Sequence, residues 1–188
     1  MCRKGIFIIL VIFIAVSACS GSAVDNTPIK NITSNGRFVQ AVSIEQIDSI
    51  VSSSKYSIIY CWGTWCKPCI SALQNEITQY LDTKDDDSTA FIPICIGGNA
   101  DKALEVLSTI DFQYGSYLFC STSTAFDKYI LNSKFKDLFN NYEKVDYVPL
   151  VLLVDSKKDI LNYDIQTKSY YPLLETLGRL KELSENLQ

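Results

Sequence analysis

Two cysteines separated by two residues, Cys66 and Cys69, are the side chains in this sequence best suited to chemistry. A β-branched, apolar run leads into them through Trp62, and a helical pattern of apolar residues starts at Ile70. This order places Cys66 at the N-terminus of a helix, where unpaired backbone N–H groups and the helix dipole favour a negative charge. The thiolate is the attacking form of cysteine, and such surroundings lower the pKa of the thiol. The pattern therefore predicts a redox pair, with Cys66 as the nucleophile and Cys69 as the thiol that resolves the mixed disulfide.

A structural disulfide, or half of a zinc site, is the alternative for the same pair. Structural zinc takes four ligands, and the sequence contains neither a second Cys-X-X-Cys nor any histidine. The absence of histidine also excludes Ser–His and Cys–His catalysis. A formal net charge of -4 provides no basic surface of the kind that binds nucleic acid. We therefore expect no metal, no cofactor and no nucleic acid.

The N-terminal residues have the pattern of a secretory targeting segment. Arg3 and Lys4 form a short basic region, and residues 6–16 are an apolar run too short to span a bilayer comfortably. Small residues then lead to Cys19, a pattern that resembles the bacterial lipobox, in which the signal is removed and the cysteine is lipidated. We expect a lipoprotein signal peptide over residues 1–18; an ordinary signal peptide and an anchor helix are the alternatives.

Residues 19–37 are rich in Ser, Asn, Thr and Gly, and they predict a flexible tether between the lipidated Cys19 and a single domain over residues 38–188. Disulfides form and persist outside the cytoplasm. The domain is therefore expected in the periplasm of a bacterial cell envelope, held at the membrane by its lipid. Ser20, rather than Asp, follows Cys19, and by the sorting rules of enterobacteria this favours the outer membrane over the inner one.

Strand and helix patterns alternate around the cysteine pair. Ser43 and Gln46 form a capping box at the start of a helix that ends near Ser54. The apolar run 57–62 is expected to be a central strand buried on both faces. The other elements are expected at 38–42 (strand), from residue 70 (helix), at 90–96 (strand), after Asn99 (helix), within 112–120 (short strand), at 126–139 (helix, interrupted near 132–133), at 150–154 and 160–165 (hairpin) and at 172–187 (helix).

The stretch Trp65-Cys66-Lys67-Pro68-Cys69 resembles the active site of thioredoxin-like proteins. Extended back to Trp62, it is most similar to the membrane-tethered, extracytoplasmic thiol–disulfide oxidoreductases of the TlpA/ResA kind. A second match lies far away in the sequence, where Val148-Pro149 directly precedes a buried strand. The order of the elements also reproduces a thioredoxin fold. The resemblance implies an α/β domain with a central mixed β-sheet that is flanked by helices on both faces.

The resemblance also implies roles for the residues around the pair. The two residues between the cysteines, here Lys67 and Pro68, tune the redox potential in this family, and Trp65 corresponds to a surface tryptophan beside the substrate groove. Pro149 corresponds to a cis-proline that faces the cysteines, and Val148 to a residue whose backbone pairs with an extended substrate. Trp62, by contrast, is expected to pack beneath the site.

Tyr60 departs from the family pattern. Thioredoxins carry a buried Asp six residues before the first cysteine, and the membrane-tethered branch often carries an Asn there. A tyrosine can donate a hydrogen bond, but it does not accept a proton near neutral pH. Glu76 and Asp146 are candidate substitutes for the missing acid. Glu76 lies almost two helical turns beyond Cys69, and we expect both to be solvated charges.

Three further cysteines lie in the expected domain. Cys61 and Cys95 fall within predicted strands, where packing in the core is the default for a cysteine. Cys120 lies in a less regular region, and a Cys95–Cys120 disulfide is an alternative to core packing for these two.

Together these patterns predict an enzyme, a lipid-anchored protein thiol–disulfide oxidoreductase whose substrates are protein thiols or disulfides. The resemblance favours the reducing direction, for example in cytochrome c maturation, with electrons from a membrane-bound donor. Three alternatives remain: an oxidant or isomerase with the same residues, an accessory lipoprotein whose pair is structural or a sensor, and a thiol copper carrier.

Overall fold

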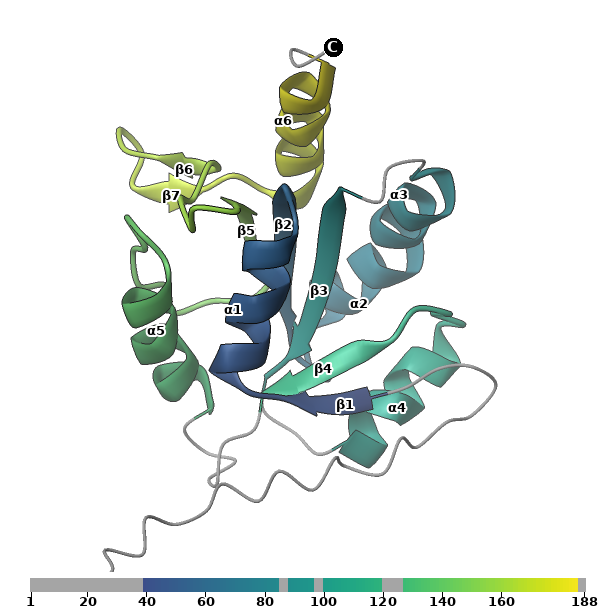
Figure 1. Cartoon of the computed structure of the whole chain (residues 1–188). Coiled ribbons are helices and arrows are strands. Elements are labelled where there is room, and N and C mark those ends of the chain that lie inside the picture. The colour runs from purple at the N-terminus through teal and green to yellow at the C-terminus, as the bar shows by residue number, and fades with distance from the viewer. Residues whose placement is uncertain (1–38, 85–87, 97–99, 120–126, 186–188) are drawn as a thin grey trace, which may run out of the picture.

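The computed structural model describes residues 39–84, 88–96, 100–119 and 127–185. Its centre is a five-stranded sheet in the order β1-β4-β3-β2-β5 (Figure 1). The strands are β1 (Val39–Val42), β2 (Tyr56–Trp62), β3 (Thr89–Cys95), β4 (Ser116–Phe119) and β5 (Leu150–Asp155). The strands β1 to β4 run parallel to one another, and β5 runs antiparallel to its neighbour β2. The sheet is therefore mixed, as the sequence predicts.

Helices cover both faces of this sheet (Figure 1). On one face lie α1 (Ile44–Ser53) and α5 (Asp127–Leu138). On the other lie α4 (Ala100–Thr109), α6 (Leu173–Glu185) and the helix that follows β2. That helix consists of α2 (Lys67–Ala72), the π-helical turn η1 (Leu73–Ile77) and α3 (Thr78–Thr83). The predicted arrangement of a central sheet between two helical layers is confirmed.

β2 lies between β3 and β5, and its side chains alternate between the two layers. Tyr60 and Trp62 belong to the core on the side of α2, together with Cys69. Ile59 and Cys61 belong to the core beside α1 and α5. All seven residues of β2 are buried, which confirms a strand covered on both faces. The turn that leaves the end of β2 is therefore anchored in the best-packed part of the sheet.

Two local predictions about helices have different outcomes. The predicted capping box of α1 is confirmed, because Gln46 N–H donates to Ser43 Oγ at 3.3 Å and Ser43 N–H donates to Gln46 Oε1 at 2.8 Å. The predicted interruption near residues 132–133 is wrong, since α5 continues through them. Asn132 weakens a helix when its side chain competes with the backbone, but here that side chain bonds to a loop outside the helix.

The predicted hairpin partner of β5 is wrong over most of residues 160–165. Ile160 still forms a bridge with Val154. The chain then leaves the sheet, and β6 (Tyr163–Asp164) pairs with β7 (Ser169–Tyr170) in a separate two-stranded sheet. Backbone groups on the outer edge of β5 are consequently paired by something other than a strand.

Asn162 supplies the missing partner. Its side chain is fully buried. Its Oδ1 accepts a hydrogen bond from Leu153 N–H at 2.9 Å, and its Nδ2 donates to the Val151 carbonyl at 2.9 Å and to Thr176 Oγ1 at 3.0 Å. A side-chain amide thus satisfies the two backbone groups of β5 that a continued hairpin would have paired.

The predicted signal peptide, tether and lipidation site, Cys19, lie outside the described residues, as do Asn99 and Cys120. Within the described ranges, no helix has the length and apolar character needed to cross a membrane.

Candidate active site

Cys66 is the N-cap residue of α2, where the sequence places it. Its backbone N–H donates to the Gly63 carbonyl at 2.9 Å, which closes the turn after β2. Its Sγ accepts from the Cys69 N–H at 3.2 Å, so the sulfur itself takes the place of a capping oxygen. Pro68 lies in the first helical turn, where its missing N–H costs no helical hydrogen bond. The sulfur of Cys66 therefore lies where the helix favours a thiolate.

Cys66 and Cys69 form a disulfide. Cys66 exposes 7% of its surface, whereas Cys69 exposes 0%. Of the two sulfurs, that of Cys66 is the one that an external disulfide or thiol can approach. This asymmetry matches a nucleophilic first cysteine and a sheltered second one.

The tryptophans on either side of the turn have separate places. A Cβ atom built on Gly63 would lie 2.9 Å from the indole ring of Trp65, so glycine makes room for that ring to fold back over the turn. The Trp65 side chain nevertheless stays 62% exposed beside Cys66. Trp62 is buried and donates its Nε1–H to Ser116 Oγ at 3.0 Å. The expectation that Trp62 packs beneath the site is confirmed.

The second motif meets the first in space. The Val148–Pro149 peptide bond is cis, as the resemblance implies. The Val148 carbonyl oxygen lies 3.8 Å from Cys66 Sγ. In the disulfide this sulfur has no proton, so the approach is a van der Waals contact; in the reduced form it places a thiol beside a carbonyl acceptor. Tyr147, which the sequence does not single out, is 50% exposed directly before Val148.

Tyr60 lies under the pair, on the resolving side. Its hydroxyl donates to the Cys69 carbonyl at 3.1 Å. Burial raises the pKa of this phenol far above its ordinary value, and the nearby charge of Glu76 raises it further. Tyr60 thus serves as a hydrogen-bond donor to the helix that carries Cys69, and it does not replace the missing acid.

Glu76 differs from its expected place as a solvated charge. It belongs to the π-helical turn η1 and is half-buried. Its Oε2 atom is buried and has no hydrogen-bond partner within the described part of the chain. Its charge is also close enough to act on the Tyr60 phenol. Asp146, the other candidate, is exposed and lies 4.0 Å from the Lys144 ammonium, which confirms it as a solvated charge.

The remaining cysteines of the described residues lie in the core. Cys61 is buried in the layer of α1 and α5, and burial raises the pKa of its thiol well above the ordinary value. Cys95 is buried in the opposite layer, with Cys66 and Cys69. Core packing is confirmed for both, while a pairing with Cys120 lies outside the described residues. Within those residues, no three His, Cys, Asp or Glu side chains gather as metal ligands would.

Comparison with known proteins connects this geometry to a fold. No family model matches the chain, and no curated protein matches it. Among solved structures, a candidate thiol–disulfide oxidoreductase from Bacteroides vulgatus is similar at 14% identity and a TM-score of 0.51, over 74% of this chain and 78% of that one. A candidate protein disulfide isomerase from Bacteroides thetaiotaomicron is similar at 17% identity and a TM-score of 0.49, over 74% and 76%. A thiol–disulfide oxidoreductase from Bacteroides fragilis reaches 19% identity and a TM-score of 0.45, over 69% and 81%.

The chain therefore has an α/β thioredoxin-like fold, with the mixed sheet and flanking helices found in thiol–disulfide oxidoreductases. At such identities the likeness shows the fold alone. Within that fold the chain carries a Cys-X-X-Cys disulfide at a helix N-terminus, opposite a cis-proline.

Proposed function

We propose that this protein is an extracytoplasmic thiol–disulfide oxidoreductase that exchanges disulfides with other proteins through Cys66 and Cys69. One observation carries the proposal: the Cys66 sulfur caps a helix, is bonded to Cys69 and lies 3.8 Å from the backbone of the residue before a cis-proline. In this setting the thiolate form of Cys66 is stabilised by the helix. The Val148 backbone beside it offers an edge along which an extended polypeptide can align.

The reducing reaction proceeds in two exchange steps. The Cys66 thiolate attacks a substrate disulfide, forms a mixed disulfide and releases the first substrate sulfur as a thiol. Cys69, once deprotonated, attacks Cys66 Sγ, so the Cys66–Cys69 disulfide forms and the second substrate sulfur leaves. Two electrons pass from the cysteine pair to the substrate. A membrane-bound dithiol donor would return them to the pair.

Glu76 is our candidate for the group that takes the proton of Cys69. The support is its partly buried carboxylate in the helix that carries Cys69, and the reach of its charge to Tyr60, whose hydroxyl contacts the Cys69 carbonyl. A carboxylate oxygen buried without a partner lowers stability, and an unsatisfied buried group in a native protein calls for an explanation such as a catalytic role. In this role Glu76 replaces the acid that Tyr60 displaces.

The other site residues receive supporting roles. The exposed Trp65 borders the groove in which a substrate lies, and the backbone of Val148, directly before Pro149, pairs with the substrate. Lys67 and Pro68 are both exposed, between the cysteines, and they tune the redox potential. The domain would work in the periplasm, tethered by residues 19–37 to a membrane through a lipidated Cys19, with the outer membrane favoured.

One observation favours a second candidate function. Cys66 exposes only 7% of its surface, and a largely buried, slow-reacting pair is what an accessory protein with a structural or sensor disulfide would have. The two functions differ in whether Cys66 forms a mixed disulfide with a partner protein.

A trapping experiment separates them. The full-length Cys69→Ser variant, produced in a bacterial envelope, should accumulate mixed disulfides with proteins through Cys66, because the resolving step is blocked. The Cys66→Ser/Cys69→Ser variant is the matched control and should accumulate none. If Cys66 reacts with a small disulfide reagent but captures no protein, the accessory role takes the place of the enzyme. For the wild type, a reduction potential of about −270 mV would support the reducing direction, and a potential of about −120 mV would support an oxidant.

A further inference from the structure

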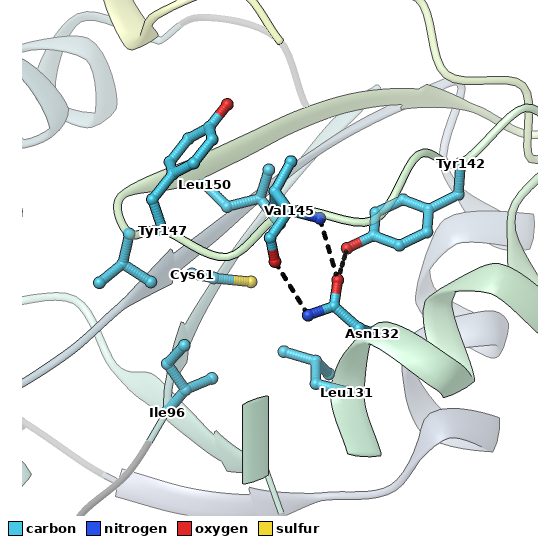
Figure 2. Close-up of a pocket in the computed structure, with 9 residues that line it drawn as sticks. Cys61, Ile96, Leu131, Asn132, Tyr142, Val145, Tyr147 and Leu150 are labelled. Carbon is cyan, nitrogen blue, oxygen red and sulfur yellow. Dashed lines mark hydrogen bonds between the residues drawn. The ribbon is translucent and has the colours of Figure 1, made fainter. Parts of the chain in front are cut away.

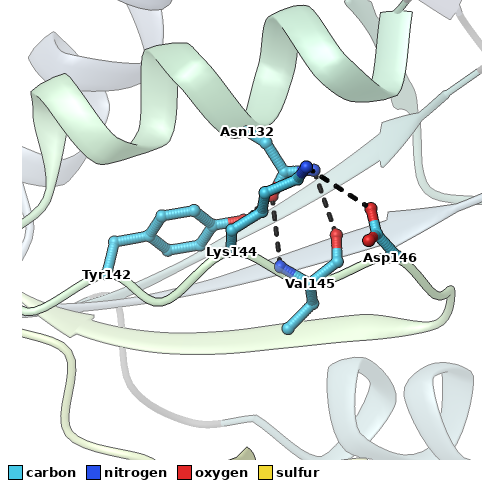
Figure 3. Close-up of polar contacts among 5 residues, drawn as sticks. All are labelled: Asn132, Tyr142, Lys144, Val145 and Asp146. Atoms are coloured by element: carbon cyan, nitrogen blue, oxygen red, sulfur yellow. Dashed lines mark hydrogen bonds and ion pairs between the residues drawn. The ribbon is translucent and has the colours of Figure 1, made fainter.

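The segment that carries Val148 is held in place by side chains. Residues 142–147 form no helix or strand. Asn132 of α5 donates its Nδ2–H to the Val145 carbonyl at 3.0 Å, and its Oδ1 accepts from the Val145 N–H at 3.3 Å (Figure 3). One side-chain amide thus pairs with both backbone groups of one residue, as a neighbouring strand would.

Asn132 is itself fixed. It exposes only 8% of its surface, and the Tyr142 hydroxyl donates to its Oδ1 at 2.5 Å (Figure 3). Two residues before Val145, a second side chain acts in the same way: the Tyr170 hydroxyl accepts from the Glu143 N–H at 2.8 Å and donates to the Glu143 carbonyl at 2.9 Å. The two side chains, Asn132 and Tyr170, bond the chain on the N-terminal side of Val148, and both are distant in the sequence from the cysteine pair.

A small cavity lies between the loop and the sheet. It is lined mainly by apolar side chains, among them Cys61, Leu131 and Leu150 (Figure 2), and Val148 also lines it. Its volume is only about 10 Å³, so the segment is packed against the sheet, and the Asn132 hydrogen bonds add to this packing in fixing the Val148 backbone. Asn132 lines the same cavity and bonds the segment from its rim (Figure 2).

We propose that Asn132 is a positioning residue for polypeptide substrates: its amide fixes the segment from Val145 to Val148 so that the Val148 backbone is held beside Cys66. The inference rests on the proposed function and specifies how the substrate-binding edge of that site is built. A polypeptide substrate needs this edge for alignment, while a small disulfide reagent needs only the Cys66 thiolate. Loss of the Asn132 amide should therefore affect the two kinds of substrate differently.

The test compares two substrates of the reduced protein, insulin and 5,5′-dithiobis(2-nitrobenzoate). In Asn132→Ala we expect the KM for insulin to rise about five- to tenfold, the factor carried by one backbone hydrogen bond, with kcat within twofold of wild type. The reaction of Cys66 with the small reagent should also stay within twofold. Asn132→Leu fills a similar volume and also lacks both hydrogen bonds to Val145, so it should show the same rise in KM and carries the test if the alanine variant does not fold.

Tyr142→Phe removes the hydrogen bond that fixes Asn132 but leaves both bonds to Val145, so it should raise the KM for insulin less than Asn132→Ala does. Thr176→Val is the matched control: it removes a buried hydrogen bond of another side-chain amide, that of Asn162, so it should lower stability and leave the KM for insulin unchanged. An unchanged KM in both Asn132 variants, or an equal rise in Thr176→Val, would overturn the positioning role, and so would a parallel loss of reactivity toward the small reagent. A wild-type protein that reacts with the small reagent but not with insulin would instead overturn the proposed function, and this inference with it.

Discussion

Replacing Glu76 by Met removes a carboxylate whose Oε2 atom is buried and has no hydrogen-bond partner among the described residues. Leaving a polar atom buried and unpaired costs about 1–3 kcal/mol, more when the group is charged. Because the side chain is half-buried, we take the lower part of this range. The free energy of unfolding should rise by about 1–2 kcal/mol in Glu76→Met, since a thioether of similar length fills the same space without a charge.

The same substitution should slow thiol exchange. Without a nearby carboxylate, deprotonation of the buried Cys69 depends on solvent, and the release of a mixed disulfide should fall about a hundredfold, the lower limit for a positioned general base. Glu76→Gln is the matched variant. It loses the charge and should show the same kinetic defect, but its amide still leaves polar atoms buried, so the gain in stability should be absent.

Guanidinium denaturation of the oxidised protein measures the first effect, and stopped-flow decay of a preformed Cys66 mixed disulfide measures the second. A Met variant that is less stable than wild type would show that the Glu76 carboxylate has a partner in solution. A variant that resolves the mixed disulfide at the wild-type rate would refute Glu76 as the proton acceptor. Greater stability combined with slower exchange is the expected pair of results, because functional groups are often retained at a cost in stability.

Two other predictions concern the folded domain. Burial raises the pKa of the Cys61 thiol above its ordinary 9.0, and those of Tyr60 and Tyr142 above 10.0; groups with raised folded pKa values stabilise the fold below their unfolded pKa. The contribution of these groups to the free energy of unfolding should thus be constant up to about pH 8. It should then fall, with a slope that approaches about 1.4 kcal/mol per pH unit above about pH 9 for Cys61 and steepens by the same amount for each tyrosine above about pH 10. Tyr142→Phe should therefore fall less steeply than wild type above about pH 10, in denaturation curves measured from pH 7 to 11. Asn162→Ala leaves two backbone groups of β5 buried and unpaired, so it should lower the free energy of unfolding by about 2–4 kcal/mol; an unchanged denaturation midpoint would contradict the role given to Asn162.

The features that could be predicted from the sequence are those encoded by neighbouring residues. Cys66 at the N-cap of α2 follows from a strand pattern, a Cys-X-X-Cys and a helix pattern in immediate succession. The burial of β2 follows from its unbroken apolar run, and the capping box of α1 from two residues at the right spacing. The cis bond before Pro149 required the resemblance, since most X–Pro bonds are trans.

The features that could not be predicted depend on contacts between distant residues. Asn162 reads as an ordinary polar residue in a predicted strand, and only the edge of β5 shows why its amide is buried. Asn132 looks like a weak point in a helix until the loop at Val145 is placed beside it. Glu76 lies almost two helical turns beyond Cys69, a separation that predicts a solvated charge. The π-helical turn between them changes the direction in which Glu76 projects, and only the folded structure shows that its Oε2 atom is buried.

Val148 connects both helical layers to the Cys66 sulfur. Its side chain packs against the core beside α2 and also against the core beside α5, while its carbonyl contacts Cys66. In the proposed mechanism, changes in the α2 layer, such as those at Glu76, act through Cys69. Changes in the α5 layer, such as those at Asn132, act through the segment that ends at Val148. The first would affect proton transfer and the second the alignment of the substrate, so the two layers would control different steps of the proposed exchange reaction.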